Sequence, residues 1–320
     1  MTHFAQYLWR LIPANPILLR VVETGGKKRR DLFIRCGYLG LLVAIVLISL
    51  VGPNFGSASL AELSKISSTL FQKLSYLQLA LVALLAPIFT AGAITQEKDS
   101  QTYDILLSTP LSNGQIVLGS LLSRLFFVVT LLISGIPIFS ITQIFGGVAI
   151  SSIVLSFLIA AATAMVTGAL AMAIAVFKVG TRRTIFSFYL FVVIYLVGLF
   201  LLDRLPYFRV INAAGEPMAT SWFTGIHPFL ALRVIFNDPD YMPPEFGALP
   251  ANVRFWPLGW YLSNPATFYI SFMFFLSVVL VISFIFVLRR LVQSIFSFRS
   301  WILQKARVNT NNRKRKPHVI

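Results

Sequence analysis

The 320-residue chain is 57% hydrophobic and only 12% charged, with a mean hydropathy of +0.80. Soluble globular domains carry about 25% charged residues, so water is not the main solvent of this chain. The formal net charge of +16 does not indicate a nucleic-acid-binding protein, because the basic residues flank apolar runs and form no aromatic-interleaved surface. The single cysteine, Cys36, excludes an intrachain disulfide and a multi-cysteine metal site, so we expect no metal ligands.

The first 35 residues are amphipathic and basic, without the apolar stretch and cleavage site of a secretory signal peptide. Residues 4–22 mix large apolar side chains with Arg10 and Arg20, and Pro13 and Pro16 interrupt them. This pattern predicts a cytoplasmic amphipathic arm over residues 1–35, with an interfacial helix on the inner membrane surface.

Six apolar stretches are long enough to cross ~30 Å of hydrocarbon, which takes about 20 helical residues. They predict a transmembrane domain over residues 36–290, with spans near 36–52, 75–95, 115–143, 150–177, 184–202 and 266–288. The third and fourth spans come from one charge-free stretch between Arg124 and Lys178, in which Gly146-Gly147 marks the turn. The expected fold is an all-α polytopic membrane protein with six transmembrane helices.

The distribution of Lys and Arg predicts the orientation, because cytoplasmic loops carry an excess of both. With the N-terminus inside, the cytoplasmic segments hold 20 of the 27 Lys and Arg residues and the external segments hold six. We therefore expect cytoplasmic N- and C-termini, a cytoplasmic loop over 96–114 and a basic cytoplasmic tail over 291–320. The external loop over 204–264 carries Trp222, Trp256 and Trp260, so we expect it to rest on the outer membrane interface.

The loop over 96–114 is acidic where a cytoplasmic loop normally carries Lys and Arg. Glu97, Asp99 and Asp104 are three of the eleven acidic residues of the chain. Their spacing, together with an apolar Leu106 and a terminating Pro110, predicts a short amphipathic cytoplasmic helix.

The same loop resembles the loop between the second and third spans of type-2 ATP-binding-cassette exporter permeases. The resemblance is carried by Glu97-Lys98-Asp99, Thr102, Asp104, Leu106-Leu107 and Ser108-Thr109-Pro110-Leu111-Ser112, with Gly119 beyond. Residues 15–18 and 227–232 are similar to the N-terminal arm and the last external loop of that family. The resemblance therefore covers most of the chain.

The resemblance implies a permease subunit of an exporter in the cell membrane, the inner membrane if the source is bacterial. Glu97, Asp99, Thr102 and Asp104 would then couple the permease to separate ATPase subunits, which would bind the ATP and magnesium. A second permease subunit, identical or related, would complete a dimer. The alternative is that the loop is a solvated connector whose charges only aid topology.

Enzymatic activity of the chain itself is not expected. It contains no GxxxxGK[ST] phosphate loop, since Gly25-Gly26-Lys27 lacks both the spacing and the following Ser or Thr. Neither HExxH nor GxSxG occurs, and no predicted span carries a carboxylate pair, so a membrane-embedded hydrolase is not favoured.

One basic residue departs from the family pattern. The family usually places Lys directly after the glycine corresponding to Gly119, whereas this sequence has Ser120, with Arg124 the nearest base. Arg124 is the only ionisable residue inside a predicted span, and an intramembrane charge is by default a functional hypothesis. The alternative is that its long side chain simply reaches the cytoplasmic headgroups.

A stripe of small residues, Ala160, Ala164 and Gly168, recurs at four-residue intervals in the fourth span. Small residues permit close helix approach in lipid. Helix packing within the chain is the expected use, with a dimer seam or a translocation path as the alternatives.

Two other functions remain open. A secondary transporter driven by an ion gradient normally places Asp, Glu or His at mid-membrane, and the predicted spans contain none there. A non-transporting membrane anchor or assembly scaffold needs only helices and a docking loop. The spans indicate neither the substrate nor the direction of transport.

Overall fold

The computed structural model describes residues 29–51, 59–99, 113–144, 146–177, 181–236 and 238–287, together with Leu19. In these residues six helices are long and apolar enough to cross a membrane, which confirms the predicted helical fold with six spans. They are α3 (Arg29–Val51), α4 (Leu60–Asp99), α6 (Asn113–Ile144), α7 (Ile150–Phe177), α8 (Thr181–Asp203) and a final helix, Pro265–Val287. The predicted tail and, apart from Leu19, the predicted interfacial helix lie outside these residues.

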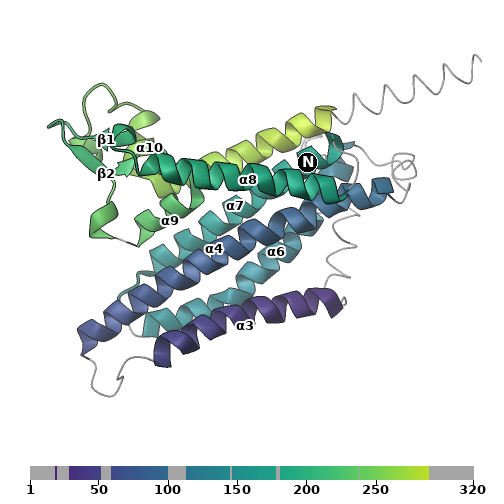
Figure 1. Ribbon diagram of the computed structural model, residues 1–320, viewed down its shortest axis with the longest axis horizontal. Helices are drawn as coiled ribbons and strands as arrows, with labels where there is room; N and C mark the ends of the chain where they lie inside the picture. Colours follow the sequence, from purple (N-terminus) through teal and green to yellow (C-terminus); the bar gives the residue numbers. More distant parts are fainter. Residues whose placement is uncertain are drawn as a thin grey trace, which may run out of the picture.

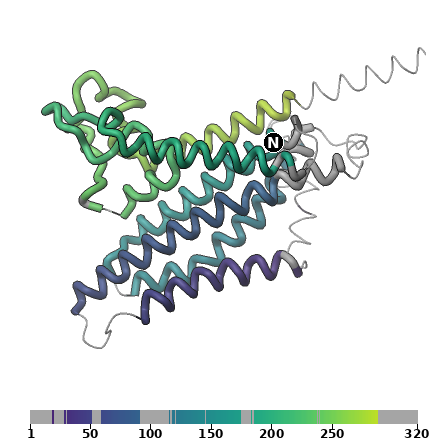
Figure 2. Tube along the Cα trace, in the orientation of Figure 1, coloured from purple at the N-terminus to yellow at the C-terminus, as the bar shows by residue number. Residues whose placement is uncertain are grey.

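The helices form a bundle with a central group and two flanks (Figure 1). α4 packs against both α6 and α7, α3 lies against α4 and α6, and α8 lies on the other side against α4 and α7. In an apolar 18-residue stretch of each span, 50% of the residues are buried in α4, 50% in α6 and 56% in α7, against 17% in α3, 6% in α8 and 22% in the final helix. The trace in Figure 2 shows the same order of helices, with α3 and α8 on opposite flanks.

α4 begins at Leu60, well before the predicted start of the second span at residue 75. Its first turn carries a capping box, in which the Ser59 amide donates to the Glu62 carboxylate at 2.7 Å and the Glu62 amide donates to the Ser59 hydroxyl at 3.3 Å. A capping box satisfies two backbone donors that otherwise lack a partner at a helix start. At its other end α4 continues to Asp99, past the predicted start of the cytoplasmic loop at residue 96.

The other helix ends lie closer to the predicted ones. α3 starts at Arg29, inside the segment predicted as the cytoplasmic arm. α6 and α7 meet at the predicted glycine turn, where Gly146 and Gly147 have φ angles of +75° and +82°. Such angles are readily adopted only by glycine, so the dipeptide fixes this turn at the end of the bundle where α4 begins.

The segment between α8 and the final helix folds into a small unit of its own. It contains a two-stranded antiparallel sheet, β1 (Arg209–Ile211) and β2 (Pro217–Ser221), and the helices α9 (Pro228–Ile235) and α10 (Leu258–Ser263). Three short 3-10 turns, Pro206–Phe208, Pro239–Tyr241 and Phe246–Ala248, complete it. The sheet is a departure from a purely α fold. Val210, Leu249 and Leu262 form the buried centre of the whole unit.

The external location of this unit remains a prediction that labelling can test. Asp240 is exposed in the structure, so a cysteine placed there in a Cys36→Ser background should react with a membrane-impermeant maleimide added to intact cells. A cysteine at position 101, in the predicted cytoplasmic loop, should react only after the membrane is opened. Protection of position 240 in intact cells would contradict the topology.

Candidate functional site

The predicted coupling residues lie at and beyond the C-terminal end of α4 in the sequence. Glu97 and Asp99 are in the last turn of this helix, and their side chains lie outside the described residues. Thr102 and Asp104 lie wholly outside the described residues. The described backbone therefore leads straight from the centre of the bundle into the loop predicted to contact the ATPase, without a break in the helix.

Arg124 lies in α6, one turn inside the candidate span Leu121–Ile144. Its side chain is half-buried, between the buried residues Leu121 and Leu125 along the helix. The neighbouring helix α3 places another guanidinium near this end of the bundle, since the Cζ atom of Arg35 is 5.4 Å from the centre of the Phe127 ring. Both cations lie close to the membrane boundary predicted to be cytoplasmic.

The predicted role of Arg124 can be tested by two substitutions. If it replaces the family lysine as a cation at this end of α6, Arg124→Gln should lower the transport rate on the order of tenfold, equivalent to ~1.4 kcal/mol. Arg124→Lys should retain most of the rate because it keeps the charge. Size-exclusion chromatography of both variants controls for folding. Full transport by the Gln variant would leave simple snorkelling as the explanation.

The small-residue stripe of α7 lies in the core of the bundle. Ala160 and Ala164 are 1% and 2% exposed. A Cβ atom on Gly168 would lie 3.1 Å from the Thr90 side chain of α4 and 3.2 Å from the Leu125 side chain of α6. Glycine thus lets three helices meet at one point, and the stripe packs against helices of the same chain.

The middle of α4 is tied to α8 beside a helix irregularity. Pro87 lies inside α4, and because proline has no backbone N–H, the carbonyl of Ala83 lacks its usual helical partner. α8 is hydrogen-bonded to α4 within one turn of this proline, because the Tyr189 hydroxyl of α8 donates to the Leu84 carbonyl of α4. The Thr90 hydroxyl donates to the Ala86 carbonyl at 2.8 Å. This junction adjoins a cavity.

The cavity next to this junction has a volume of about 370 Å³ and is here named the α8 cavity. Its walls come from α4, α7, α8, the final helix and the start of α9. Its lining includes Ala83, Thr163, Thr167, Phe191, Val192, Tyr195, Tyr269 and Phe272. A second, more open cavity of about 680 Å³ lies farther along α8 and shares Leu196 with the first. Arg204 and Arg233 line this outer cavity, so the polar character increases toward the small folded unit.

His227 joins α8 to this unit and starts α9. Its Nδ1 accepts from the Leu230 amide at 3.2 Å, and its Nε2 is 3.2 Å from the Leu196 carbonyl. A carbonyl only accepts, so the proton is on Nε2 and the ring is neutral. Burial lowers the pKa of the imidazole to about 4. The Tyr195 hydroxyl donates to the Ile226 carbonyl and adds a second bond between the same two elements.

This arrangement predicts a loss of stability in acid. In the unfolded chain His227 takes up a proton near pH 6.5, whereas in the fold it stays neutral down to about pH 4. Its contribution is complete above pH ~6.5 and is lost as the pH falls through the window to ~4, on the order of 2–3 kcal/mol between pH 7.5 and 4.5. The thermal unfolding midpoint in detergent should fall over this range.

The matched control is His227→Asn, because asparagine caps a helix start equally well but does not titrate. The Asn variant should lose less stability than the wild type between pH 7.5 and 4.5. All other titrating groups are common to both proteins and cancel in the comparison. The same pH dependence in both would exclude His227 as the cause.

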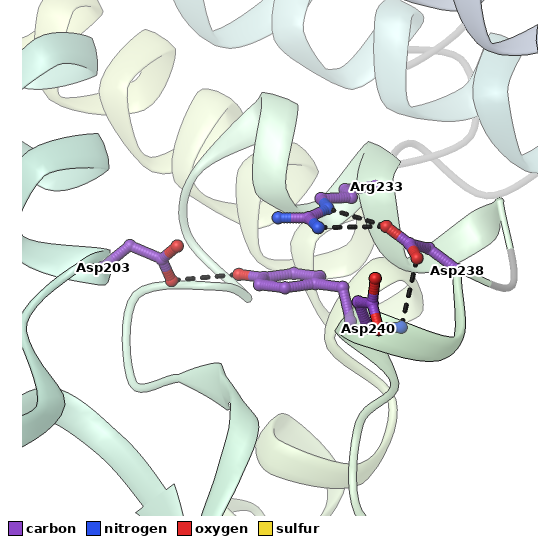
Figure 3. Close-up of polar contacts among 5 residues, drawn as sticks. Asp203, Arg233, Asp238 and Asp240 are labelled. Atoms are coloured by element: carbon purple, nitrogen blue, oxygen red, sulfur yellow. Dashed lines mark hydrogen bonds and ion pairs between the residues drawn. The ribbon is translucent and has the colours of Figure 1, made fainter.

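A network of polar side chains ties the end of α8 to the small unit (Figure 3). The buried Asp203 carboxylate accepts from the Ser221 hydroxyl at 2.5 Å and from the Tyr241 hydroxyl at 2.9 Å. The Arg233 guanidinium lies 4.3 Å from the centre of the Tyr241 ring and donates twice to Asp238, at 3.0 and 3.2 Å. The Arg233 hydrogen bonds lower the pKa of the Asp238 carboxyl, and burial raises the pKa of Tyr241.

Sequence reasoning did not find this network. The two donors to Asp203 come from residues 18 and 38 positions later in the chain. No local pattern relates such positions. His227 begins the segment 227–232, which resembles the last external loop of the family. Its role as a helix cap was predictable from the sequence, because a capping residue followed by proline is a helix-start signal.

Comparison with known families identifies the chain. The family model described as ABC-2 family transporter protein matches residues 32–298, which is most of the sequence. The chain belongs to the ABC-2 transporter family. It is therefore a multi-pass cell-membrane protein and an ATP-binding-cassette permease, a membrane subunit that works with an ATP-binding subunit. The comparison with curated proteins gives no match.

The extent of the match shows which parts of this ABC-2 permease are family features. It begins in α3 and ends beyond the final helix. All six spans, the predicted coupling loop and the small unit after α8 thus fall within the region matched by the family.

Proposed function

We propose that this ABC-2 permease is the membrane half of an exporter, in which ATP hydrolysis by a separate subunit moves a substrate outward. The observation that carries the proposal is the course of α4. It is one helix from Leu60 to Asp99 and lies against α3, α6, α7, α8 and α9. A displacement at its inner end is therefore passed on to most of the bundle through direct packing, as bistable packed elements allow.

The coupling contacts in this proposal are made by Glu97, Asp99, Thr102 and Asp104. The first two belong to the last turn of α4, so force on the loop acts on the helix directly. Outward transport and pairing with a second permease, identical or related, are supported by the resemblance of the loop to those of exporters. ATP and magnesium bind in the partner, since the sequence has no phosphate loop.

The test is reconstitution of the permease with its ATPase partner in liposomes. We expect the complex to hydrolyse Mg-ATP, and we expect the permease alone to hydrolyse none. Transport should require ATP on the side where the 96–114 loop lies, and should carry substrate away from that side. An ATPase that binds the permease but supports no transport would indicate a scaffold. Transport driven by an ion gradient without ATP would contradict the proposal.

A further inference from the structure

The α8 cavity lies at membrane depth. It is bounded by residues from the middle of α7, such as Thr163 and Thr167, and by Tyr195 of α8 and Tyr269 near the start of the final helix. Its volume of about 370 Å³ falls in the range of small-molecule sites, about 300–1,000 Å³. The cavity has room for roughly a dozen groups the size of a water molecule, at ~30 Å³ each. It can therefore hold a segment of one hydrocarbon chain but not a whole two-chain lipid.

Every side-chain hydroxyl among the described lining residues is already hydrogen-bonded. Thr163 donates to the Ile159 carbonyl at 2.7 Å and therefore accepts from Tyr269 at 2.8 Å. Thr167 donates to the Thr163 carbonyl at 2.6 Å, and Tyr195 donates to the Ile226 carbonyl. None of these described lining residues is charged. A buried water needs two to four polar partners, so the cavity favours hydrocarbon over water.

The rim of the cavity is apolar and partly open. Phe191 of α8 is 55% exposed and Phe272 of the final helix is 37% exposed, and both line the cavity. The surface at this point belongs to two candidate membrane spans, so the surrounding medium is hydrocarbon. α8 is tied to its neighbours by Tyr189 on one side of Phe191 and by Tyr195 on the other. Between these two ties α8 forms one wall of the cavity.

We propose that the α8 cavity binds one hydrocarbon chain of a lipid-like molecule, which enters sideways from the membrane between Phe191 and Phe272. The occupant is a hydrocarbon chain because the walls offer neither charge nor a free hydroxyl in the described residues, and the opening faces the bilayer interior. This site goes beyond the export function and does not depend on it. The chain can belong to a resident membrane lipid or to a transported molecule.

The experiment uses the full-length permease in nanodiscs with palmitic acid that carries a photoactivatable diazirine near its end. We expect cross-links on peptides that line the α8 cavity, above the level on the exposed lipid-facing residues Phe186 and Ile194. Ala83→Phe fills the cavity from α4 and should lower this labelling by about tenfold or more, equal to ~1.4 kcal/mol of binding. The matched control is Leu84→Phe, because Leu84 is 50% exposed on the same helix, and it should leave the labelling unchanged.

Val192→Phe fills the same cavity from α8 and replaces Ala83→Phe if that variant does not fold. Equal labelling of cavity and exposed residues in the wild type, or unchanged labelling in a folded filled variant, would overturn the proposal. A second arm adds the ATPase partner and ATP. Cavity labelling that falls during turnover assigns the chain to a transported molecule, and constant labelling assigns it to a resident lipid. The first arm needs no ATPase, so its outcome is independent of the export proposal.

Discussion

Replacing Glu97, Asp99 and Asp104 together by alanine should leave the permease inserted and folded but separate it from its ATPase. Acidic side chains on a cytoplasmic loop oppose the charge bias that topology favours, so they point to pairing with Arg or Lys of a partner. Loss of one member of a desolvated pair costs about 2–5 kcal/mol, roughly 30-fold or more in affinity. Co-purification of the ATPase over a range of concentrations measures the change.

The control replaces an acidic residue elsewhere. Glu216 is exposed in the small unit after α8, so Glu216→Ala changes the charge of the chain without touching the loop and should leave ATPase recovery unchanged. The single variants Glu97→Ala and Asp104→Ala show whether each carboxylate belongs to a buried ion pair or to a pair at the rim of the interface. A rim pair contributes far less to the affinity for the ATPase. Unchanged complex yield and unchanged transport-linked ATPase activity in the triple variant would show that the loop is a solvated connector.

Gly147→Ala should be among the most destabilising single-methyl changes in the described part of the chain. At a φ of +82° any residue with a Cβ atom is strained, and this Cβ would lie 2.6 Å from the backbone carbonyl oxygen of Ser64 in α4. A backbone atom cannot turn aside as a side chain can, so α4 and the α6–α7 turn must separate. Strain and overpacking together should lower the free energy of unfolding by about 3 kcal/mol or more.

The neighbouring glycine supplies the control. Gly146 has a φ of +75° but nothing within 4 Å of its added Cβ, so Gly146→Ala should lose only about 1–2 kcal/mol from the left-handed conformation. Adding Ser64→Ala to Gly147→Ala removes the serine hydroxyl and leaves the carbonyl in place, so recovery should be partial. Thermal unfolding of all variants in one detergent measures these differences. Equal shifts for the two glycine variants would contradict the packing argument.

The spans were predictable because hydrocarbon imposes a length and excludes charge, two properties that a sequence states directly. The start of α4 was missed for the same reason. Lys65 and Lys73 end the charge-free stretch that predicts the second span. The helix itself continues past them, because its cap and its packing allow it to extend beyond the hydrocarbon layer. Ser59 and Glu62 carried the cap signal, and the buried residues Leu70 and Leu74 show which face packs.

The cavity and the Asp203 network were beyond prediction for a different reason. Thr163 and Tyr269 are 106 residues apart, and their 2.8 Å contact depends on how α7 and the final helix pack against each other. Such contacts follow from packing, which no local pattern encodes. The small-residue stripe was predictable, because Ala160, Ala164 and Gly168 share a helical repeat. Which helices they would face, α4 and α6 in the case of Gly168, was not.

The length of α4 has a mechanical consequence. Forty helical residues at 1.5 Å each span about 60 Å, about twice the ~30 Å thickness of the hydrocarbon layer. Such a helix works as a lever with the bilayer as its support. A tilt of about 5° moves one end relative to the other by about 5 Å, one helical turn. A tilt that starts at Asp99, next to the predicted coupling loop, would thus also displace Leu60 and the neighbouring glycine turn at the other end of α4.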